Sequence, residues 1–241
     1  MIIDKLTEVH SHILPGIDDG SPDIETSLKM IDALKRQGAK TIIATPHYYS
    51  DSISLDDFLR QRDEALKTLQ AALPEDSPKI VPAAEVYITK YLFSNENLER
   101  LCIADSGYAL IEHPFSCSFG QSTYDRLLNL NYEYKIKPIL AHIERYSALM
   151  SDEALLDDYI DMGCLVQVNI SSFTDSPRGI RKKLIKYLES GRIHLIGSDC
   201  HNLNSRAPEY EKGVKEIIKR CGQEAIDVLE RNAGLLIKWN N

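Results

Sequence analysis

The chain has 241 residues, of which 43% are hydrophobic, and its formal net charge is −8. This composition is typical of a globular protein with a large core and excludes a disordered chain. The acidic balance and the lack of a basic face argue against nucleic acid as a partner. No apolar run approaches the ~18 residues that a membrane-spanning helix needs, so we expect no membrane insertion.

The first residues of the chain include acidic side chains and no long apolar stretch, which does not fit a secretory signal. Five cysteines, at positions 102, 117, 164, 200 and 221, form no C-x-x-C pair. A scattered set of odd number fits a reducing compartment better than a disulfide framework. We therefore expect a cytoplasmic protein.

Short apolar runs, rich in β-branched residues, alternate with amphipathic stretches along the chain. The strand-like runs lie at 6–10, 40–45, 79–87, 108–113, 137–142, 164–169 and 193–198. The helix-like stretches lie near 23–37, 55–72, 120–132, 151–162, 177–190, 208–220 and 222–231. Alternation of this kind indicates a parallel sheet. We predict an α/β fold, a distorted (β/α)7 TIM-like barrel that forms a single domain over residues 1–241, with an open doubly wound sheet as the alternative.

Most of the predicted strands end in side chains that can bind a metal ion. These side chains are His10, His12, His47, Glu85, Glu112, His142, Asp199 and His201. Active sites of such barrels form where the strands end, and carboxylates that meet there repel one another unless cations lie between them. Imidazoles and carboxylates without a thiolate suit zinc, iron or manganese. The ligands are too many for one ion, so we expect two or three.

The segment GSDCHNLNSR (197–206) allows a second interpretation. Cys200 and Arg206 have the C-x5-R spacing of cysteine-dependent phosphatases, whereas Asp199 and His201 have the D-x-H spacing of a metal site. The phosphate loop of a cysteine phosphatase usually needs glycine for its turn, and HNLNS contains none. The thiol mechanism also leaves the histidines at the other strand ends unexplained. We therefore expect a packing role for Cys200.

The ordered segments HSH, TPH, AAE, IEH, AHIER and SDCH resemble the polymerase-and-histidinol-phosphatase (PHP) superfamily. The longer segments EVHSHILPGIDDG, GAKTIIATPHY, PILAHIERY and GSDCHNLNSRAP are most similar to its bacterial manganese-dependent tyrosine-protein phosphatases of the CpsB/YwqE type. The resemblance extends over residues 8–208. It implies the PHP fold, hydrolysis of phosphotyrosine by a metal-activated water, and a phosphotyrosine protein as substrate. That substrate would be the tail of a tyrosine autokinase of capsule or exopolysaccharide biosynthesis.

The resemblance also implies three divalent ions, expected to be manganese, with iron or zinc as alternatives. One ion would be held by His10, His12, Glu85 and Asp199. A second would share Glu85 and add Glu112 and His142. A third would use Asp19, His47 and His201. Asp19 is preferred to Asp18 because it directly precedes the glycine of DDG, as in the family.

Arg145 and Arg206 match the positions that hold the substrate phosphate in this family. His201 and a metal-bound water are the two candidates to protonate the leaving oxygen, and the sequence does not separate them. Aromatic residues near the strand ends are candidates to line the mouth of the site, namely Tyr48, Tyr49, Tyr87, Tyr91 and Phe119. The loop 115–120 has no assigned role.

Three other functions remain open at this stage. A histidinol-phosphatase-like phosphomonoesterase for small molecules would use the same metals. A nuclease is disfavoured by the acidic net charge and the lack of a basic groove. A non-enzymatic metal-binding module is disfavoured because the ligand set is complete.

Overall fold

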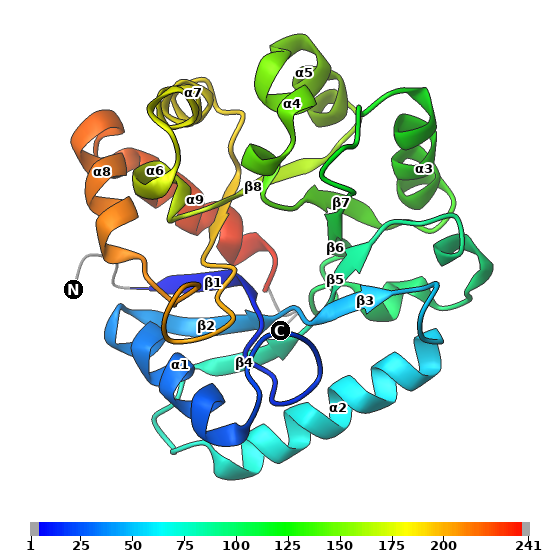
Figure 1. The fold of residues 1–241 in the computed structure, drawn as a ribbon, viewed down its shortest axis with the longest axis vertical. Coiled ribbons are helices and arrows are strands. Elements are labelled where there is room, and N and C mark those ends of the chain that lie inside the picture. Colours follow the sequence, from blue (N-terminus) through cyan, green and yellow to red (C-terminus); the bar gives the residue numbers. More distant parts are fainter. Residues whose placement is uncertain (1–4, 238–241) are drawn as a thin grey trace.

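The computed structural model describes residues 5–237, in which parallel strands form an inner ring and helices surround it (Figure 1). The expected domain of residues 1–241 therefore extends at both ends beyond the described range. The strands are β1 (Leu6–Ser11), β2 (Ala39–Ala44), β3 (His47–Tyr49), β4 (Lys79–Pro82), β5 (Glu85–Tyr87), β6 (Tyr108–Glu112), β7 (Lys137–Leu140), β8 (Leu165–Asn169) and β9 (Leu195–Gly197).

The helices follow the strands along the chain and lie on the outside of the ring, except α9, which passes behind the strands in Figure 1. They are α1 (Ile24–Arg36), α2 (Leu55–Ala72), α3 (Gln121–Tyr132), α4 (Ser147–Ser151), α5 (Glu153–Asp161), α6 (Ser172–Asp175), α7 (Arg178–Glu189), α8 (Glu211–Cys221) and α9 (Gln223–Leu235). Short 3-10 turns are η1 (Leu92–Ser94), η2 (Leu98–Leu101) and η3 (Ile143–Arg145).

Two of the strand runs are interrupted, so that nine labelled strands make up seven runs in the described part of the chain. β2 continues into β3 across Thr45–Pro46, and β4 continues into β5 across Ala83–Ala84. The pairing order is β1-β2-β4 in one sheet and β3-β5-β6-β7-β8-β9 in the other, and the neighbours are parallel. The runs coincide with the seven strands expected from the sequence.

The ring closes between β9 and β1. The backbone N–H of Asp199 donates to the carbonyl of His10 at 2.8 Å, and the N–H of His12 donates to the carbonyl of Cys200 at 3.0 Å. This closure confirms the expected seven-stranded barrel, and the alternative of an open doubly wound sheet is wrong. It also sets the two histidines of HSH directly beside the segment that carries Asp199.

A buried carboxylate supports this seam. The Oε1 atom of Glu8 accepts hydrogen bonds from the backbone N–H of His10 at 2.9 Å and of Ser198 at 3.0 Å. The β1–β2 register shifts between Glu8 and Ser11, which is the sign of a bulge. The side chain of Glu8 thus replaces a backbone partner where the strand bends, and burial raises the pKa of this carboxyl despite those bonds.

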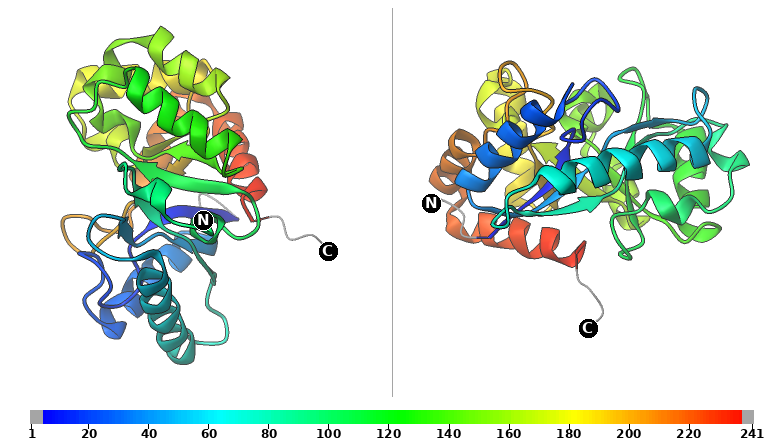
Figure 2. Two further views of the ribbon diagram at one scale, coloured as in Figure 1. Left: turned by 90° about the vertical axis from the view of Figure 1, so that its right-hand side faces the viewer. Right: turned by 90° about the horizontal axis from the view of Figure 1, so that it is seen from below.

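Apolar side chains fill the half of the barrel at the N-terminal ends of the strands. The residues that meet there, each from a different strand, are Val9, Ile43, Val81, Leu110, Ile139 and Leu195. Ala233 and Leu236, at and just beyond the end of α9, complete this cluster. Figure 2 shows α9 lying across this end of the barrel, where Glu230 accepts from the N–H of Thr7 at the start of β1. Helix α9 therefore covers the N-terminal end of the barrel, so that a functional site can open only at the C-terminal end.

The helix predicted at 151–162 is present as α5, and a separate short helix that was not predicted, α4, precedes it. The carboxylate of Asp152 accepts from the N–H groups of Ala154 and Leu155 and so starts a new helix. Gly163 and Gly191 lie just beyond the ends of α5 and α7, and they have φ of 105° and 74°. Such angles favour glycine.

Helix α8 packs directly on the turn after β8, at a point where only glycine fits. A Cβ atom on Gly213 would lie 2.4 Å from the carbonyl oxygen of Ile170. We expect Gly213→Ala to lower the free energy of unfolding by about 1–3 kcal/mol through overpacking, measured by denaturant unfolding. Gly179→Ala in α7 is the control, because nothing lies within 4 Å of its Cβ position. Equal stability of the two variants would contradict this packing.

Candidate metal centre

Polar side chains from most of the strands converge inside the C-terminal end of the barrel. They are His10, His12, Asp19, His47, Glu85, Glu112, His142, Asp199 and His201. All but Asp19 and His47 are buried. The structure therefore places every residue expected at the metal site in one region, although the residues are separated by up to 191 positions in the chain.

Two of these residues occupy left-handed backbone conformations. His142, just after β7, has a φ of 33°, and Asp199, just after β9, has a φ of 54°. Residues with a Cβ rarely adopt these angles, and they concentrate at functional sites. The side-chain oxygen of Gln167 accepts from the N–H of His142 at 2.7 Å, which holds the first turn in place. These turns direct both side chains into the barrel mouth.

The first group of potential ligands joins the HSH segment to Glu85 and Asp199. The Nε2 atom of His10 lies 3.1 Å from Glu85 Oε2 and 3.3 Å from Asp199 Oδ1. The Nε2 atom of His12 lies 3.2 and 3.4 Å from the same two oxygens. One ligand atom from each residue lies within 4.8 Å of all the others. This is the set of four that the sequence resemblance implies for one ion.

The second group surrounds Glu85 and Glu112. His142 Nε2 lies 2.9 Å from Glu85 Oε1 and 3.5 Å from Glu112 Oε1. His47 Nδ1 approaches the other oxygens of the same carboxylates, at 3.1 and 3.9 Å. The third group lies nearer to solvent, where Asp19 Oδ1 is 3.4 Å from His47 Nε2 and 3.3 Å from His201 Nε2. His47 thus presents one ring nitrogen to each of these two groups.

Burial and neighbouring charges shift the pKa values of several side chains in the cluster. Burial opposes the ionisation of Glu85, but the charge of His10 and hydrogen bonds from the imidazoles outweigh it and hold the pKa of this carboxyl well below its usual value. Burial, and then the negative charge of Glu85, raise the pKa of Glu112 to about 7. Burial, and then the charge on His12, lower the pKa of His201 to about 4. Glu85 therefore ionises readily while Glu112 holds its proton more tightly, because the two buried carboxylates repel each other when both are charged.

The donor set fits divalent cations. His47 Nδ1 and His201 Nε2 are buried atoms without a hydrogen-bond partner among residues 5–237, and each points at a carboxylate oxygen of the cluster. Buried polar atoms are normally satisfied, so orphaned ring nitrogens beside carboxylates indicate ligands. Imidazole nitrogen and carboxylate oxygen are the ligands that zinc, iron and manganese accept.

Sequence reasoning missed the residues that hold the potential ligands in place. Asp18 Oδ2 lies 2.7 Å from His12 Nδ1 and also accepts from the N–H of His47. Burial opposes the ionisation of Asp18, but its bond to His12 outweighs this and lowers the pKa of Asp18 to about 2. The two aspartates of DDG thus differ in role, since Asp18 orients a ring while Asp19 faces the cluster.

Strand β8 contributes two further supporting residues. Asn169 Nδ2 donates to Asp199 Oδ2 at 2.9 Å, and Gln167 Nε2 donates to the side-chain oxygen of Asn169 at 3.0 Å. The signal was present in the sequence, because polar residues two apart in LVQVN share one face of a strand. Such outer partners commonly change metal affinity by ~10–100-fold when they are removed.

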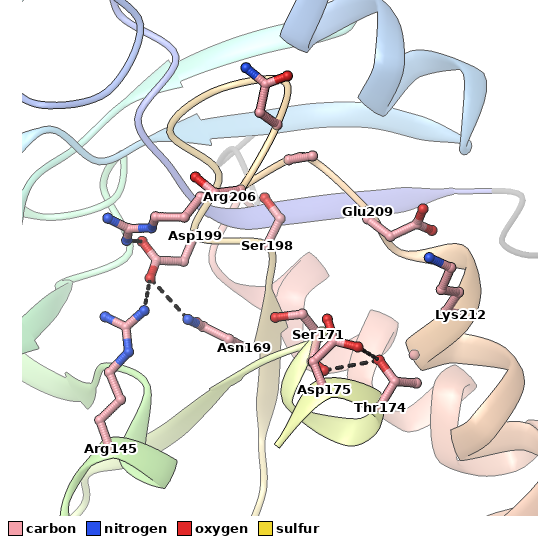
Figure 3. A pocket seen from close by; sticks show the side chains of 14 residues that line it. Arg145, Asn169, Ser171, Thr174, Asp175, Ser198, Asp199, Arg206, Glu209 and Lys212 are labelled. Atoms are coloured by element: carbon pink, nitrogen blue, oxygen red, sulfur yellow. Dashed lines mark hydrogen bonds and ion pairs between the residues drawn. The ribbon is translucent and has the colours of Figure 1, made fainter. Parts of the chain in front are cut away.

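Both expected phosphate-binding arginines lie at the rim of the cluster. Arg145 Nη2 and Arg206 Nη2 each approach Asp199 at 2.7 Å, through different carboxylate oxygens (Figure 3). They also line a cavity of about 280 Å³ together with Asp19, His47 and Glu112. Two guanidiniums thus face the space directly above the potential metal ligands.

Comparison with known proteins agrees with this geometry. The family profile described as "Capsular polysaccharide synthesis, CpsB/CapC" matches residues 6–238. The chain belongs to the CpsB/CapC family. The tyrosine-protein phosphatase CpsB of Streptococcus pneumoniae is 33% identical over 234 residues, which cover 90% of this chain and 91% of the relative. The tyrosine-protein phosphatase YwqE of Bacillus subtilis (strain 168) is 29% identical over 241 residues, covering 97% and 92%.

Solved structures support the same family. A crystal structure from work on YwqE from Bacillus subtilis and CpsB from Streptococcus pneumoniae, described there as unique metal-dependent tyrosine phosphatases, has a TM-score of 0.83 and 27% sequence identity. It covers 96% of this chain and 94% of that chain. The phosphotriesterase homology protein from Escherichia coli, with phosphate in its active site, has a TM-score of 0.58 at 12% identity, which shows a shared fold.

The structure also separates the two interpretations of the GSDCHNLNSR segment in this CpsB/CapC member. Cys200 is fully buried, and burial raises the pKa of its thiol. A nucleophilic cysteine needs an accessible, easily ionised thiol. Its neighbours Asp199 and His201 face the cluster instead. The packing role expected for Cys200 agrees with this placement.

We expect Cys200→Ser to retain at least about half of the wild-type rate of aryl phosphate hydrolysis. The serine hydroxyl can replace the thiol in its hydrogen bond with the side chain of Ser198. His201→Ala should lower that activity by ~100-fold or more, because it removes an imidazole that could bind a metal ion in the cluster. Steady-state rates of the two variants in saturating metal test this. A dead Cys200→Ser variant beside an active His201→Ala variant would revive the thiol mechanism.

Proposed function

We propose that the cluster holds three divalent cations and hydrolyses the phosphate ester of phosphotyrosine with a metal-activated water. The chain is a metal-dependent tyrosine-protein phosphatase of the CpsB type, a phosphoric monoester hydrolase of capsular polysaccharide synthesis. The observation that carries the proposal is the convergence of buried imidazoles and carboxylates below two arginines. We also propose that residues 1–241 form a single phosphatase domain.

The proposed ligands follow the three groups of the cluster. The first ion is assigned to His10, His12, Glu85 and Asp199. The second is assigned to Glu85, Glu112 and His142. The third is assigned to Asp19, His47 and His201. When bound, the ions would lower the pKa of a coordinated water and offset the charge of the phosphate oxygens. We propose manganese, with iron or zinc as alternatives that the same donors accept.

The arginines are assigned to the substrate phosphate. A guanidinium presents paired N–H donors that match phosphate oxygens, and it stays charged at any working pH. Arg145 and Arg206 reach Asp199 from opposite sides, so both have donors left to turn toward the cavity. Their positive charge favours a phosphate dianion and stabilises the charge that moves onto its oxygens during hydrolysis.

For His201 we propose the role of ligand. The pKa of about 4 leaves this ring neutral near pH 7, and the neutral ring is the coordinating form. Its alternative role as proton donor to the leaving oxygen fits less well, because a neutral ring is a poor acid. Tyrosine has a pKa near 10 as a leaving group, so its departure needs less assistance than that of an alkyl alcohol.

Aromatic rings at the mouth support an aryl substrate. Tyr49 and Tyr87, with ring centroids 5.4 Å apart, line the same cavity as the arginines. Phe115 also lines this cavity; it is 59% exposed, and its ring centroid lies 5.9 Å from the Arg145 guanidinium. Exposed rings around a cavity that ends in cations suit an aromatic phosphate. The loop 115–120, which had no assigned role, thus supplies a wall of the mouth.

The expected aromatic set needs correction at three positions. Tyr48 and Phe119 are buried, and Tyr48 packs against Phe58 with centroids 4.8 Å apart. Tyr91 is half exposed but does not line the cavity. The alternation of side chains along β3 explains the first case, since Tyr48 and Tyr49 point to opposite faces.

The proposed partner is a phosphotyrosine protein, and within it the tail of a bacterial tyrosine kinase of capsule synthesis. The family description and the printed names of the relatives support this choice. The net charge of −8 disfavours nucleic acid. Within residues 5–237, no helix has the length and apolar character to span a bilayer. We propose the cytoplasm as the location, where the five free cysteines would stay reduced.

A side-by-side assay separates this function from a small-molecule phosphatase. Metal-stripped protein reconstituted with manganese should cleave a phosphotyrosine peptide with a kcat/KM at least ~100-fold above that for a phosphoserine peptide or histidinol phosphate, because only the first joins its phosphate directly to an aromatic ring and has a phenol as leaving group. Metal-stripped protein should be inactive. Preference for histidinol phosphate would contradict the substrate assignment, and full activity without metal would contradict the mechanism.

The aromatic mouth has its own test. We expect Phe115→Ala to raise KM for an aryl phosphate about threefold to tenfold with little change in kcat, since a lost ring contact is worth ~0.5–1.5 kcal/mol. Tyr91→Ala is the matched control, an exposed ring outside the cavity. Steady-state kinetics on an aryl and an alkyl phosphate measure both effects. Identical kinetics for the two variants would remove Phe115 from the mouth.

A further inference from the structure

A second hollow adjoins the catalytic cavity. It has a volume of about 310 Å³, and Arg145 and Arg206 line both this hollow and the catalytic cavity. Figure 3 shows the two arginines at one side of the hollow, beside Asp199. It lies between the turn after β8, the segment after β9 and the start of α8. Its other polar lining residues are Asn169, Ser171, Thr174, Asp175, Ser198, Asp199, Asn204, Ser205, Glu209 and Lys212.

The lining of this polar hollow differs in kind from that of the aromatic mouth. It includes no aromatic ring, and its only residues without a polar side chain are Ala207 and Gly213. Ser171 Oγ and the side-chain amide of Asn204 make no hydrogen bond with any residue in the described part of the chain. Free hydroxyl and amide groups suit the backbone of an extended peptide rather than a second ring.

The charges in the polar hollow divide into an inner and an outer set. At the inner end Asp199 is paired with both arginines. At the outer end lie Asp175, Glu209 and Lys212, and none of the three forms an ion pair with another residue of the range 5–237. Asp175 accepts only from the neutral hydroxyl of Thr174, at 2.9 Å. The outer end therefore carries two carboxylates and one ammonium, with a negative balance.

We propose that the polar hollow binds the polypeptide next to the phosphotyrosine and prefers a basic side chain there. The proposal rests on the proposed function: Arg145 and Arg206, which would hold the phosphate, line both spaces, so the hollow lies within reach of the side chains that flank the phosphotyrosine. Asp175 and Glu209 bind the lysine or arginine of the substrate, and Ser171 and Asn204 bind its backbone. The acidic net charge of the whole chain acts in the same direction.

The test uses peptides that differ at one position. Phosphotyrosine peptides carry lysine, alanine or glutamate at each of the three positions before and after the phosphotyrosine, and p-nitrophenyl phosphate serves as a substrate without a peptide. At one or more positions the lysine peptide should have a KM about threefold to tenfold below that of the alanine peptide, with similar kcat, and glutamate should be worst. The range corresponds to weak, partly exposed ion pairs, so the preference should shrink in high salt.

Two variants of opposite effect locate the preference. The double variant Asp175→Asn, Glu209→Gln should reduce it to less than about twofold while leaving p-nitrophenyl phosphate hydrolysis unchanged. Lys212→Ala should enlarge it, because a competing cation is removed. Glu75→Gln, an exposed acid before β4 at the other end of the barrel, is the matched control and should alter neither substrate.

The possible outcomes separate a failure of the peptide-binding proposal from a failure of the proposed phosphatase function. Hydrolysis of p-nitrophenyl phosphate with equal KM for the three peptides at every position would overturn the peptide site and leave the phosphatase intact. A preference that persists in the double variant, or that falls in Lys212→Ala, would also overturn it. No hydrolysis of any phosphotyrosine substrate by the metal-loaded enzyme would instead contradict the proposed function.

Discussion

The structure depends on the burial of several carboxylates in one small space. Glu85, Glu112 and Asp199 all lie inside the barrel, and Glu85 has four imidazoles within 3.2 Å. Buried like charges are expensive unless unlike charge lies between them. Protons meet this need only in part, as the raised pKa of Glu112 shows. Divalent cations would supply the missing positive charge, and cations so placed can also activate a water for hydrolysis of a phosphate ester.

The barrel separates stability from function along its axis. Apolar side chains and the end of α9 fill the N-terminal end, which therefore holds together mainly through apolar packing. The C-terminal half is filled by side chains that would otherwise repel. The seam between β1 and β9 runs along both halves. Glu8 bridges the two strands there, and Asp199, just beyond β9, has a left-handed backbone conformation. The seam therefore fixes the positions of ligands from both ends of the chain.

Much of this arrangement follows from the sequence, for identifiable reasons. Alternating apolar runs predicted the seven strands, and because active sites form at strand ends the ligands could be placed at one mouth. The distinction between Asp18 and Asp19 came from the resemblance, since adjacent aspartates are chemically alike. The mouth could be predicted only in part. Tyr49 and Tyr87 were expected there, but whether Tyr48 or Tyr49 faces the cavity depends on the register of β3, and the place of Phe115 depends on a loop without periodicity. The polar hollow involves residues from three separate segments and has no motif.

The central claim is that these imidazoles and carboxylates bind more than one divalent cation. Calorimetric titration of metal-stripped protein with manganese tests it most directly. We expect three ions per chain, and we expect Glu85→Gln to abolish the binding of at least two of them because Glu85 belongs to two groups. A stoichiometry of one or none, with wild-type protein that remains fully folded, would contradict it.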